Sequence, residues 1–261
     1  MRPTSTLLAA AALGFAFTTT ASAEEVRMGV TPGPHAQIME KVKELLAPKG
    51  IELEILEFSD YVVPNQALAD GELDANSFQH QPYLDNQVAD RGYDLVSVAQ
   101  TVNYPMGVYS QKVKALGELG EGATVAVPND PTNGARALLL LEQLGLIGVA
   151  DSAGLKATPL DIEENPKNLR IVELDAAQLP RSLADVDAAA INTNYALEAG
   201  LDPQNDAIAR EEAKSPYVNV IAVRAENKDA DWVAPLVAAY HSAEVKQFVA
   251  DTFKGSVIAS W

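Results

Sequence analysis

Hydrophobic and polar positions along the chain follow two periods in turn. Short apolar runs rich in β-branched residues alternate with segments in which apolar residues recur every three or four positions, the spacing of a helix. The first run, Val26–Val30, ends at a Thr-Pro-Gly-Pro turn, and residues 35–46 then show the helical spacing. Residues 51–58 alternate apolar and acidic side chains, which predicts a half-buried strand.

The same alternation continues to the C-terminus. Further strands are expected near residues 73–78, 93–102, 106–110, 123–130, 169–174, 187–192 and 217–224. Helices are expected over residues 64–69, 82–91, 132–145 and 232–253. Strands that alternate with helices favour an α/β fold with mostly parallel sheets, in which ligands bind beyond the carboxyl ends of the strands.

Polar and aromatic residues gather in the segments that follow five of these strands. The segments read TPGP, SDY, NSFQHQPY, PNDPTNGAR and INTNY. In the third, Phe78 and Tyr83 are interleaved with Asn76, Gln79, His80 and Gln81, and Tyr61 lies in the segment before it. Aromatic walls with a few directed polar groups are typical of small-molecule pockets, so the five segments predict one shared site.

Arg136 is the candidate anchor for an anionic group. It follows PNDPTNG in the first turn of a predicted helix. Free N–H groups and partial positive charge at a helix N-terminus attract carboxylates, and an arginine can add a bidentate grip. An ordinary surface arginine at a helix start is the alternative, and it stays open on these grounds alone.

Charge and cysteine content narrow the function. Residues 1–23 have the features of a cleavable export signal, with Arg2, an apolar stretch and a final Ala-Ser-Ala. After cleavage, 18 basic residues face 36 acidic ones, a net charge of −18, which disfavours nucleic acid as a partner. The acidic residues are dispersed, as in ELEILE, DIEEN and REE, which is typical of a solvated surface. With no cysteine, the chain forms no disulfide and has no cysteine to carry a lipid.

Catalytic and cofactor motifs are missing from the sequence. Three scattered histidines, His35, His80 and His241, lack metal-ligand spacing, and neither a nucleophile elbow nor a phosphate-binding loop occurs. We therefore expect no enzyme activity, no cofactor and no metal.

Four long segments resemble the methionine-binding NlpA/MetQ family of ABC importers. They are residues 61–84, 125–141, 188–201 and 215–224, and the resemblance runs from about Val26 to Trp261. It implies a two-lobed periplasmic binding protein of type II-like fold, with two mixed or parallel sheets flanked by helices and joined by two crossover segments. The lobes expected from it are residues 24–108 with 222–261, and residues 109–221.

The resemblance also implies the ligand and its contacts. Tyr61, Phe78, His80 and Tyr83 resemble the aromatic side of the family's pocket, and Arg136 resembles its carboxylate anchor. Amides that hold the amino-acid end are matched by Asn219 and by Asn192 or Asn194; a helix cap is an equal alternative for Asn194. The implied partners are L-methionine and an ABC permease with its ATPase, with the binding protein a monomer.

Other readings of the same residues remain. The ligand could be another apolar amino acid, D-methionine or a short methionine-containing peptide. Two alternatives are more distant. The protein could be an envelope enzyme that uses His80, or an envelope interaction protein without a small ligand. Many family members are lipoproteins, whereas alanine fills the cleavage site here; we therefore expect a free periplasmic protein, cleaved after Ala23, that is not a lipoprotein.

Overall fold

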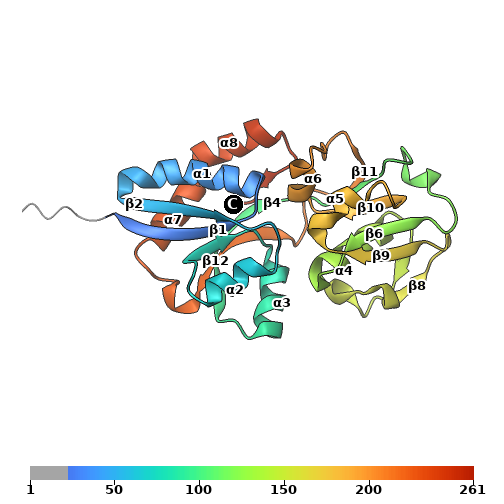
Figure 1. Ribbon diagram of the computed structural model, residues 1–261, viewed down its shortest axis with the longest axis horizontal. Coiled ribbons are helices and arrows are strands. Elements are labelled where there is room, and N and C mark those ends of the chain that lie inside the picture. The colour runs from blue at the N-terminus through green and yellow to red at the C-terminus, as the bar shows by residue number, and fades with distance from the viewer. Residues whose placement is uncertain (1–22) are drawn as a thin grey trace, which may run out of the picture.

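The computed structural model describes residues 23–261, so the predicted export signal lies outside the described residues except for its last one. Two separate β-sheets form the two halves of an elongated molecule (Figure 1). The α/β prediction, with two mixed sheets flanked by helices, is confirmed.

The first sheet has the strand order β13-β4-β12-β3-β1-β2. Strands β1, β2 and β3 run parallel, whereas β12 pairs antiparallel with β3 and β4, and β13 pairs antiparallel with β4. The strands are β1 (Glu24–Val30), β2 (Ile51–Glu57), β3 (Ala75–Ser77), β4 (Leu95–Asn103), β12 (Val218–Arg224) and β13 (Ile258–Ala259). The helices of this half are α1 (Pro34–Leu46), α2 (Val63–Ala69), α3 (Gln81–Arg91), α7 (Val233–Tyr240) and α8 (Ala243–Phe253).

The second sheet has the order β11-β5-β10-β6-β9. Its strands are β5 (Gly107–Tyr109), β6 (Thr124–Pro128), β9 (Arg170–Leu174), β10 (Ala188–Ile191) and β11 (Ala207–Arg210). Helices α4 (Pro131–Gln143), α5 (Leu179–Ser182) and α6 (Thr193–Glu198) and the small β7–β8 hairpin (Gly148–Val149, Ile162–Glu164) accompany it. Short 3₁₀ turns lie at Ala47–Lys49, Leu116–Glu118, Gly154–Lys156, Pro159–Asp161, Ala176–Gln178 and Ala225–Asn227.

The chain passes between the sheets twice. It leaves the first sheet after β4 and enters the second with β5, then returns between β11 and β12. All of β12 and the C-terminal helices therefore belong to the first half, beside strands formed much earlier in the sequence (Figure 1). The expected lobe boundaries remain a prediction.

One predicted helix is in fact two. The apolar pattern over residues 232–253 predicts a single helix, but α7 ends at Tyr240 and α8 begins at Ala243. Ser242 between them has extended backbone angles, and its side chain accepts a hydrogen bond from the N–H of Val245. A serine that caps a new helix in this way interrupts the old one, although the apolar spacing continues across the break.

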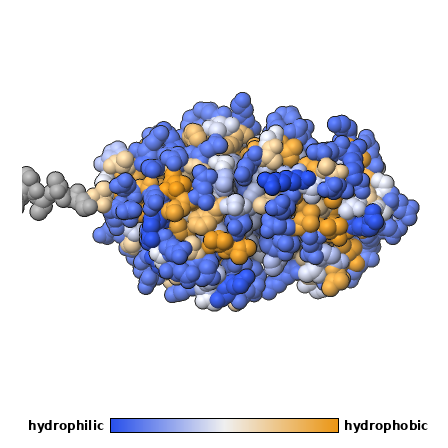
Figure 2. All heavy atoms as spheres, viewed as in Figure 1, coloured by the Kyte–Doolittle hydropathy of each residue, from blue (hydrophilic) through white to orange (hydrophobic). Residues whose placement is uncertain are grey.

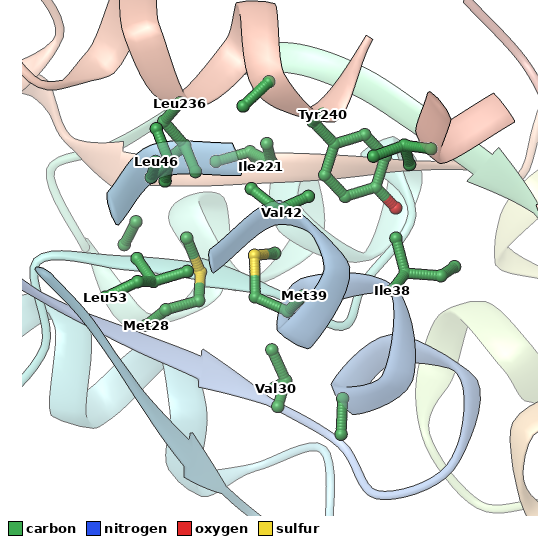
Figure 3. Packing of buried hydrophobic residues seen from close by; sticks show 14 of the residues in the cluster. Met28, Val30, Ile38, Met39, Val42, Leu46, Leu53, Ile221, Leu236 and Tyr240 are labelled. Carbon is green, nitrogen blue, oxygen red and sulfur yellow. The ribbon is translucent and has the colours of Figure 1, made fainter. Parts of the chain in front are cut away.

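Helix α1 shows why the first half holds together. Its apolar face is buried between the sheet and α7, with Ile38, Met39 and Val42 pointing into the same core (Figure 3). Met28 of β1 and Leu236 of α7 meet that face from opposite sides. A Leu or Met side chain buried in this way contributes about 1.5–3 kcal/mol, so the core fixes α1 and the loop that precedes it.

The face of the molecule in Figure 2 is mostly hydrophilic, with smaller apolar areas on both halves. Among residues 23–261, the exposed large apolar side chains are Val62, Val63, Leu155 and Leu160. Within residues 23–261, no helix combines the length and the apolar character that crossing a membrane requires.

Gly134 in α4 lies close to the backbone at the end of β6. A Cβ at this position would lie 2.9 Å from the carbonyl oxygen of Pro128, which is backbone and cannot rotate away. Gly134→Ala should therefore lower the free energy of unfolding by ~1–3 kcal/mol, since overpacking outweighs the gain of up to ~1 kcal/mol in helix propensity. Gly117→Ala is the matched control, because a Cβ there meets nothing within 4 Å. Urea denaturation that finds Gly134→Ala as stable as the wild type would contradict this packing argument.

Candidate ligand-binding site

A cavity between the two sheets brings the predicted site residues together. The volume open to the centre of a water-sized sphere is about 20 Å³, so the lining side chains lie close together. All eight residues named from the sequence line it: Tyr61, Phe78, His80, Tyr83, Arg136, Asn192, Asn194 and Asn219. Four more that the sequence analysis did not assign also line it: His35, Gln79, Tyr104 and Asn133.

The cavity lies where the strands predict a site. Phe78 follows β3, Asn192 follows β10, and Arg136 belongs to α4, which starts after β6. Each of these strands ends in a segment that the sequence analysis singled out. The carboxyl ends of the strands in both sheets therefore point their loops toward one shared space.

His80 is held in one protonation state and one tautomer. It precedes α3 as its N-cap, and its Nδ1 accepts a hydrogen bond of 3.1 Å from the N–H of Tyr83. Nε2 therefore carries the proton and donates to Oδ1 of Asn133 at 3.2 Å. Burial, with help from the positive charge of Arg136, lowers the pKa of His80 to about 3, so the ring is neutral at physiological pH.

Asn133 joins both halves of the site. Its Oδ1 accepts from His80 in the first half and also from Nδ2 of Asn192 in the second, at 2.8 Å. Its Nδ2 donates to both carboxylate oxygens of Asp130, at 3.1 and 3.0 Å. This residue was part of the PNDPTNGAR motif, but nothing in the sequence distinguished a bridging amide from an ordinary helix-start residue.

Asp130 occupies the N-terminus of α4. Its carboxylate accepts from the N–H of Asn133 at 2.9 Å and caps the helix. The expectation that free N–H groups of this helix meet a ligand's carboxylate is therefore wrong, because a carboxylate of the chain itself already takes that position.

Arg136 is 2% exposed and is already engaged by the protein. Its Nε donates to Oε1 of Glu211 at 2.8 Å, and its Nη2 donates to Oε2 of Glu211 at 2.6 Å and to the carbonyl of Tyr104 at 2.7 Å. The guanidinium carbon also lies 4.4 Å from the centre of the Tyr217 ring. The open alternative of a surface arginine is thus excluded, and Glu211 emerges as a partner that the sequence did not indicate.

The aromatic residues form a connected wall. Tyr61 lies 6.0 Å from Phe78 and 6.2 Å from Tyr83 between ring centres, with edge-to-face or tilted geometry. The Tyr83 hydroxyl donates to the carbonyl of Tyr61 at 2.8 Å. From the other half, Tyr195 packs on Tyr61 with ring centres 5.0 Å apart. The wall is therefore held in place from both sides of the cavity.

Part of the amide-rich run supports the aromatic wall through side-chain hydrogen bonds, although Gln79 also lines the cavity. Asn65, Asn76 and Gln79 bond to one another through their side chains, at 2.7 to 3.0 Å. All three are almost fully buried. The unusual density of amides in this segment is explained mainly by this cluster, which fixes the loop that carries Phe78 and His80.

The two asparagines of INTNY both line the cavity. Asn192 is the N-cap residue of α6, yet its side chain makes no capping hydrogen bond. Asn194 lies inside the helix, so the capping alternative for its side chain is wrong. Its Oδ1 instead accepts from the hydroxyl of Tyr61 at 2.6 Å, across the two halves.

Four buried polar atoms among the lining residues have no hydrogen-bond partner in residues 23–261. They are Nδ1 of His35, the hydroxyl of Tyr104, Oδ1 of Asn192 and Nδ2 of Asn194. A buried polar group without a partner costs ~1–3 kcal/mol, so four such atoms around one cavity indicate a polar ligand that satisfies them.

The chain matches the family model described as NlpA lipoprotein over residues 26–261. It belongs to the NlpA lipoprotein family. The resemblance seen in the sequence is thereby confirmed. The D-methionine-binding lipoprotein MetQ of Escherichia coli K12 is 50% identical over 239 residues, which cover 90% of this chain and 88% of the relative. The corresponding protein of Salmonella typhimurium is 51% identical over the same length, with the same coverage.

Solved structures of the family agree with the fold. A nutrient binding protein from Burkholderia cenocepacia, bound to methionine, has a TM-score of 0.89 and 55% identity, covering 90% of this chain and all of that one. The crystal structure of the methionine binding protein MetQ has a TM-score of 0.88 and 50% identity, covering 91% of this chain and 98% of that one. The two-lobed arrangement expected from the sequence is therefore confirmed.

The family corrects one expectation. The missing cysteine had favoured a protein without a lipid, but the family model is described as a lipoprotein and the relatives carry that word in their names. The expectation of a free, unlipidated protein is contradicted. It rested on one residue type, whereas the family match rests on residues 26–261.

The two buried histidines of the cavity predict a pH dependence of stability. Burial lowers the pKa of His35, like that of His80, to about 3 from an ordinary 6.5. Between these values the unfolded chain binds protons that the folded protein does not, so the free energy of unfolding falls as the pH drops below 6.5. Each histidine should lower the free energy of unfolding by ~2 kcal/mol when the pH falls from 7 to 5.

Urea titrations of the wild type, His35→Gln and His80→Gln at both pH values test this. Each variant should lose about 2 kcal/mol less than the wild type on the same acidification. Equal losses in all three proteins would show that these rings are not buried in neutral form.

Proposed function

We propose that this chain binds methionine between its two sheets and acts as the substrate-binding component of a methionine ABC importer. The observation that carries the proposal is the shared cavity, which combines Arg136, four unpaired polar atoms and an aromatic wall. The names of the relatives support the ligand: two are D-methionine-binding proteins, and one structural neighbour is bound to methionine.

The carboxylate of the ligand is assigned to Arg136. It is the one formally charged residue among those that line the cavity in the described part of the chain. The hydrogen bonds to Glu211 and Tyr104 use Nε and Nη2, and Nη1 takes part in none of them. A guanidinium fixed in this way can add a charge-assisted hydrogen bond to a carboxylate without reorganising. Nδ2 of Asn194 is a second donor of suitable type.

The ammonium group is assigned to the neutral acceptors. Oδ1 of Asn192, Nδ1 of His35 and the hydroxyl of Tyr104 can each accept an N–H. Asn219 lies beside His80 through a backbone bridge and completes the amide side of the pocket.

The thioether is assigned to the aromatic wall of Tyr61, Phe78 and Tyr83, with His80 beside it. Sulfur near an aromatic edge gains ~0.3–1.5 kcal/mol per contact, and an unbranched chain adapts to the space left by fixed rings. These assignments describe binding and release without a reaction, and the ligand would be passed to a permease driven by an ATPase.

Removal of the anchor tests the proposal. Arg136→Ala should raise the dissociation constant for methionine by ~30-fold or more, since truncating one partner of a buried charge pair costs ~2–5 kcal/mol. Arg136→Lys should be intermediate, because it keeps the charge and loses the planar fork. Calorimetric titration with L- and D-methionine, on protein that has been unfolded, dialysed and refolded, measures both.

Arg181→Ala is the matched control, an exposed arginine on α5 of the same half. It should bind as the wild type does. Thermal unfolding of each variant separates lost binding from lost folding. An Arg136→Ala protein that folds and binds within a few-fold of the wild type would contradict the assignment, and a wild type that binds only other amino acids or short peptides would change the substrate.

A further inference from the structure

The residues that line the cavity include one charged side chain, while the charges that balance it lie behind the lining. Among the twelve lining residues, Arg136 alone carries a formal charge, since His35 and His80 are neutral. No carboxylate lines the cavity within residues 23–261. On the lining alone, the site would be positive and would favour any anion of suitable shape.

Glu211 cancels that charge from behind. Its side chain is 8% exposed, and both of its oxygens accept from the guanidinium. Oε2 also accepts from the N–H of Met106 at 2.9 Å, which adds a third bond to the ionised form. Two opposite charges this close, in a poorly solvated place, act on a third group as a nearly neutral pair.

The carboxyl of Asp130 also offsets part of the positive charge of Arg136. It accepts hydrogen bonds from Nδ2 of the lining residue Asn133, and its charge is partly balanced by the N-terminus of α4. Burial raises the pKa of Asp130 and so weakens its contribution, which leaves the surroundings of the ligand close to neutral in total. A zwitterion leaves this balance unchanged, whereas a monoanion adds one uncompensated negative charge to a buried site.

Hydrogen bonding makes only part of this distinction. The three free acceptors, Asn192, His35 and Tyr104, are neutral and can accept an O–H as readily as an N–H. An ammonium group can donate to all three, whereas the hydroxyl of a 2-hydroxy acid donates to one and leaves the others unpaired. The charge balance adds a second, independent penalty on the anion.

We propose that Glu211 is a specificity-determining residue that makes this site select zwitterionic amino acids over 2-hydroxy acids and other monoanions of the same shape. The inference rests on the proposed function, because it assumes that methionine occupies the cavity with its carboxylate on Arg136. Glu211 acts through the guanidinium and does not itself contact the ligand.

The test compares L-methionine with L-2-hydroxy-4-(methylthio)butanoate, in which a hydroxyl replaces the ammonium group. Calorimetric titrations are run on refolded wild type, Glu211→Gln and Glu212→Gln. Glu212 is the matched control, since it is the exposed neighbour and its loss changes the net charge of the protein equally. The ratio of the two dissociation constants is the readout, because a structural defect weakens both ligands together.

The wild type should prefer methionine by about 100-fold or more, the scale of one uncompensated charge a few Å away at the effective dielectric constant of a protein. Glu211→Gln should reduce that ratio at least tenfold, because the anion then meets an unbalanced guanidinium. Glu212→Gln should keep the wild-type ratio.

The outcomes separate the two proposals. A wild type that binds neither ligand overturns the proposed function and this inference with it. Binding of methionine with an unchanged ratio in Glu211→Gln overturns the inference alone. Should Glu211→Gln fail to fold, the wild type still provides a test, because a preference for methionine below tenfold contradicts charge selection.

Discussion

The buried ion pair of Arg136 and Glu211 is the contact on which the arrangement of the two halves depends. The chain crosses between the sheets twice, and both crossings meet at this pair. Nη2 of Arg136 bonds the carbonyl of Tyr104 on the first crossing, and Glu211 on the second bonds Met106 through its side chain and its backbone. Removing either partner would leave an unpaired charge in the interior, which is far more costly than losing a surface contact.

The rest of the site is built outward from that pair. Tyr217 packs on the guanidinium and, with ring centres 5.1 Å apart, on His80. His80 reaches Asn133 on the opposite half, and Asn133 in turn orients Asn192. Each residue in this series of contacts has a defined partner, and atoms at the cavity that have none, such as Oδ1 of Asn192, mark places for a ligand. The network links the two halves and leaves a specific set of donors and acceptors unpaired at the cavity.

Much of the fold follows from the sequence because its causes are local. Alternating periods locate the strands and helices, and the rule for the carboxyl ends of parallel strands explains why eight residues from distant segments share one cavity. The break between α7 and α8 was missed, since the apolar spacing continues through Ser242 and only its capping bond reveals the interruption. The return of β12 to the first sheet is a non-local pairing that periodicity does not encode.

The site was less predictable where its residues act through other residues. Glu211 belongs to an REE run that was interpreted as solvated surface, and it is buried only because a distant arginine pairs with it. His35 and Tyr104 carry no motif, and their importance comes from burial beside the cavity. Asn133 was within a recognised motif, but its bridging role depends on His80 and Asn192, which reach it from other elements. Such roles are properties of the assembled structure.

The most direct test of the central claim is a crystal structure of the refolded protein with L-selenomethionine as ligand, the chain itself carrying ordinary methionine. Anomalous scattering locates the selenium, and the density locates the carboxylate. The account predicts selenium against Phe78 and Tyr83, with the carboxylate on Arg136 and the amino group toward Asn192. Selenium outside this cavity, or a carboxylate directed away from Arg136, would contradict it.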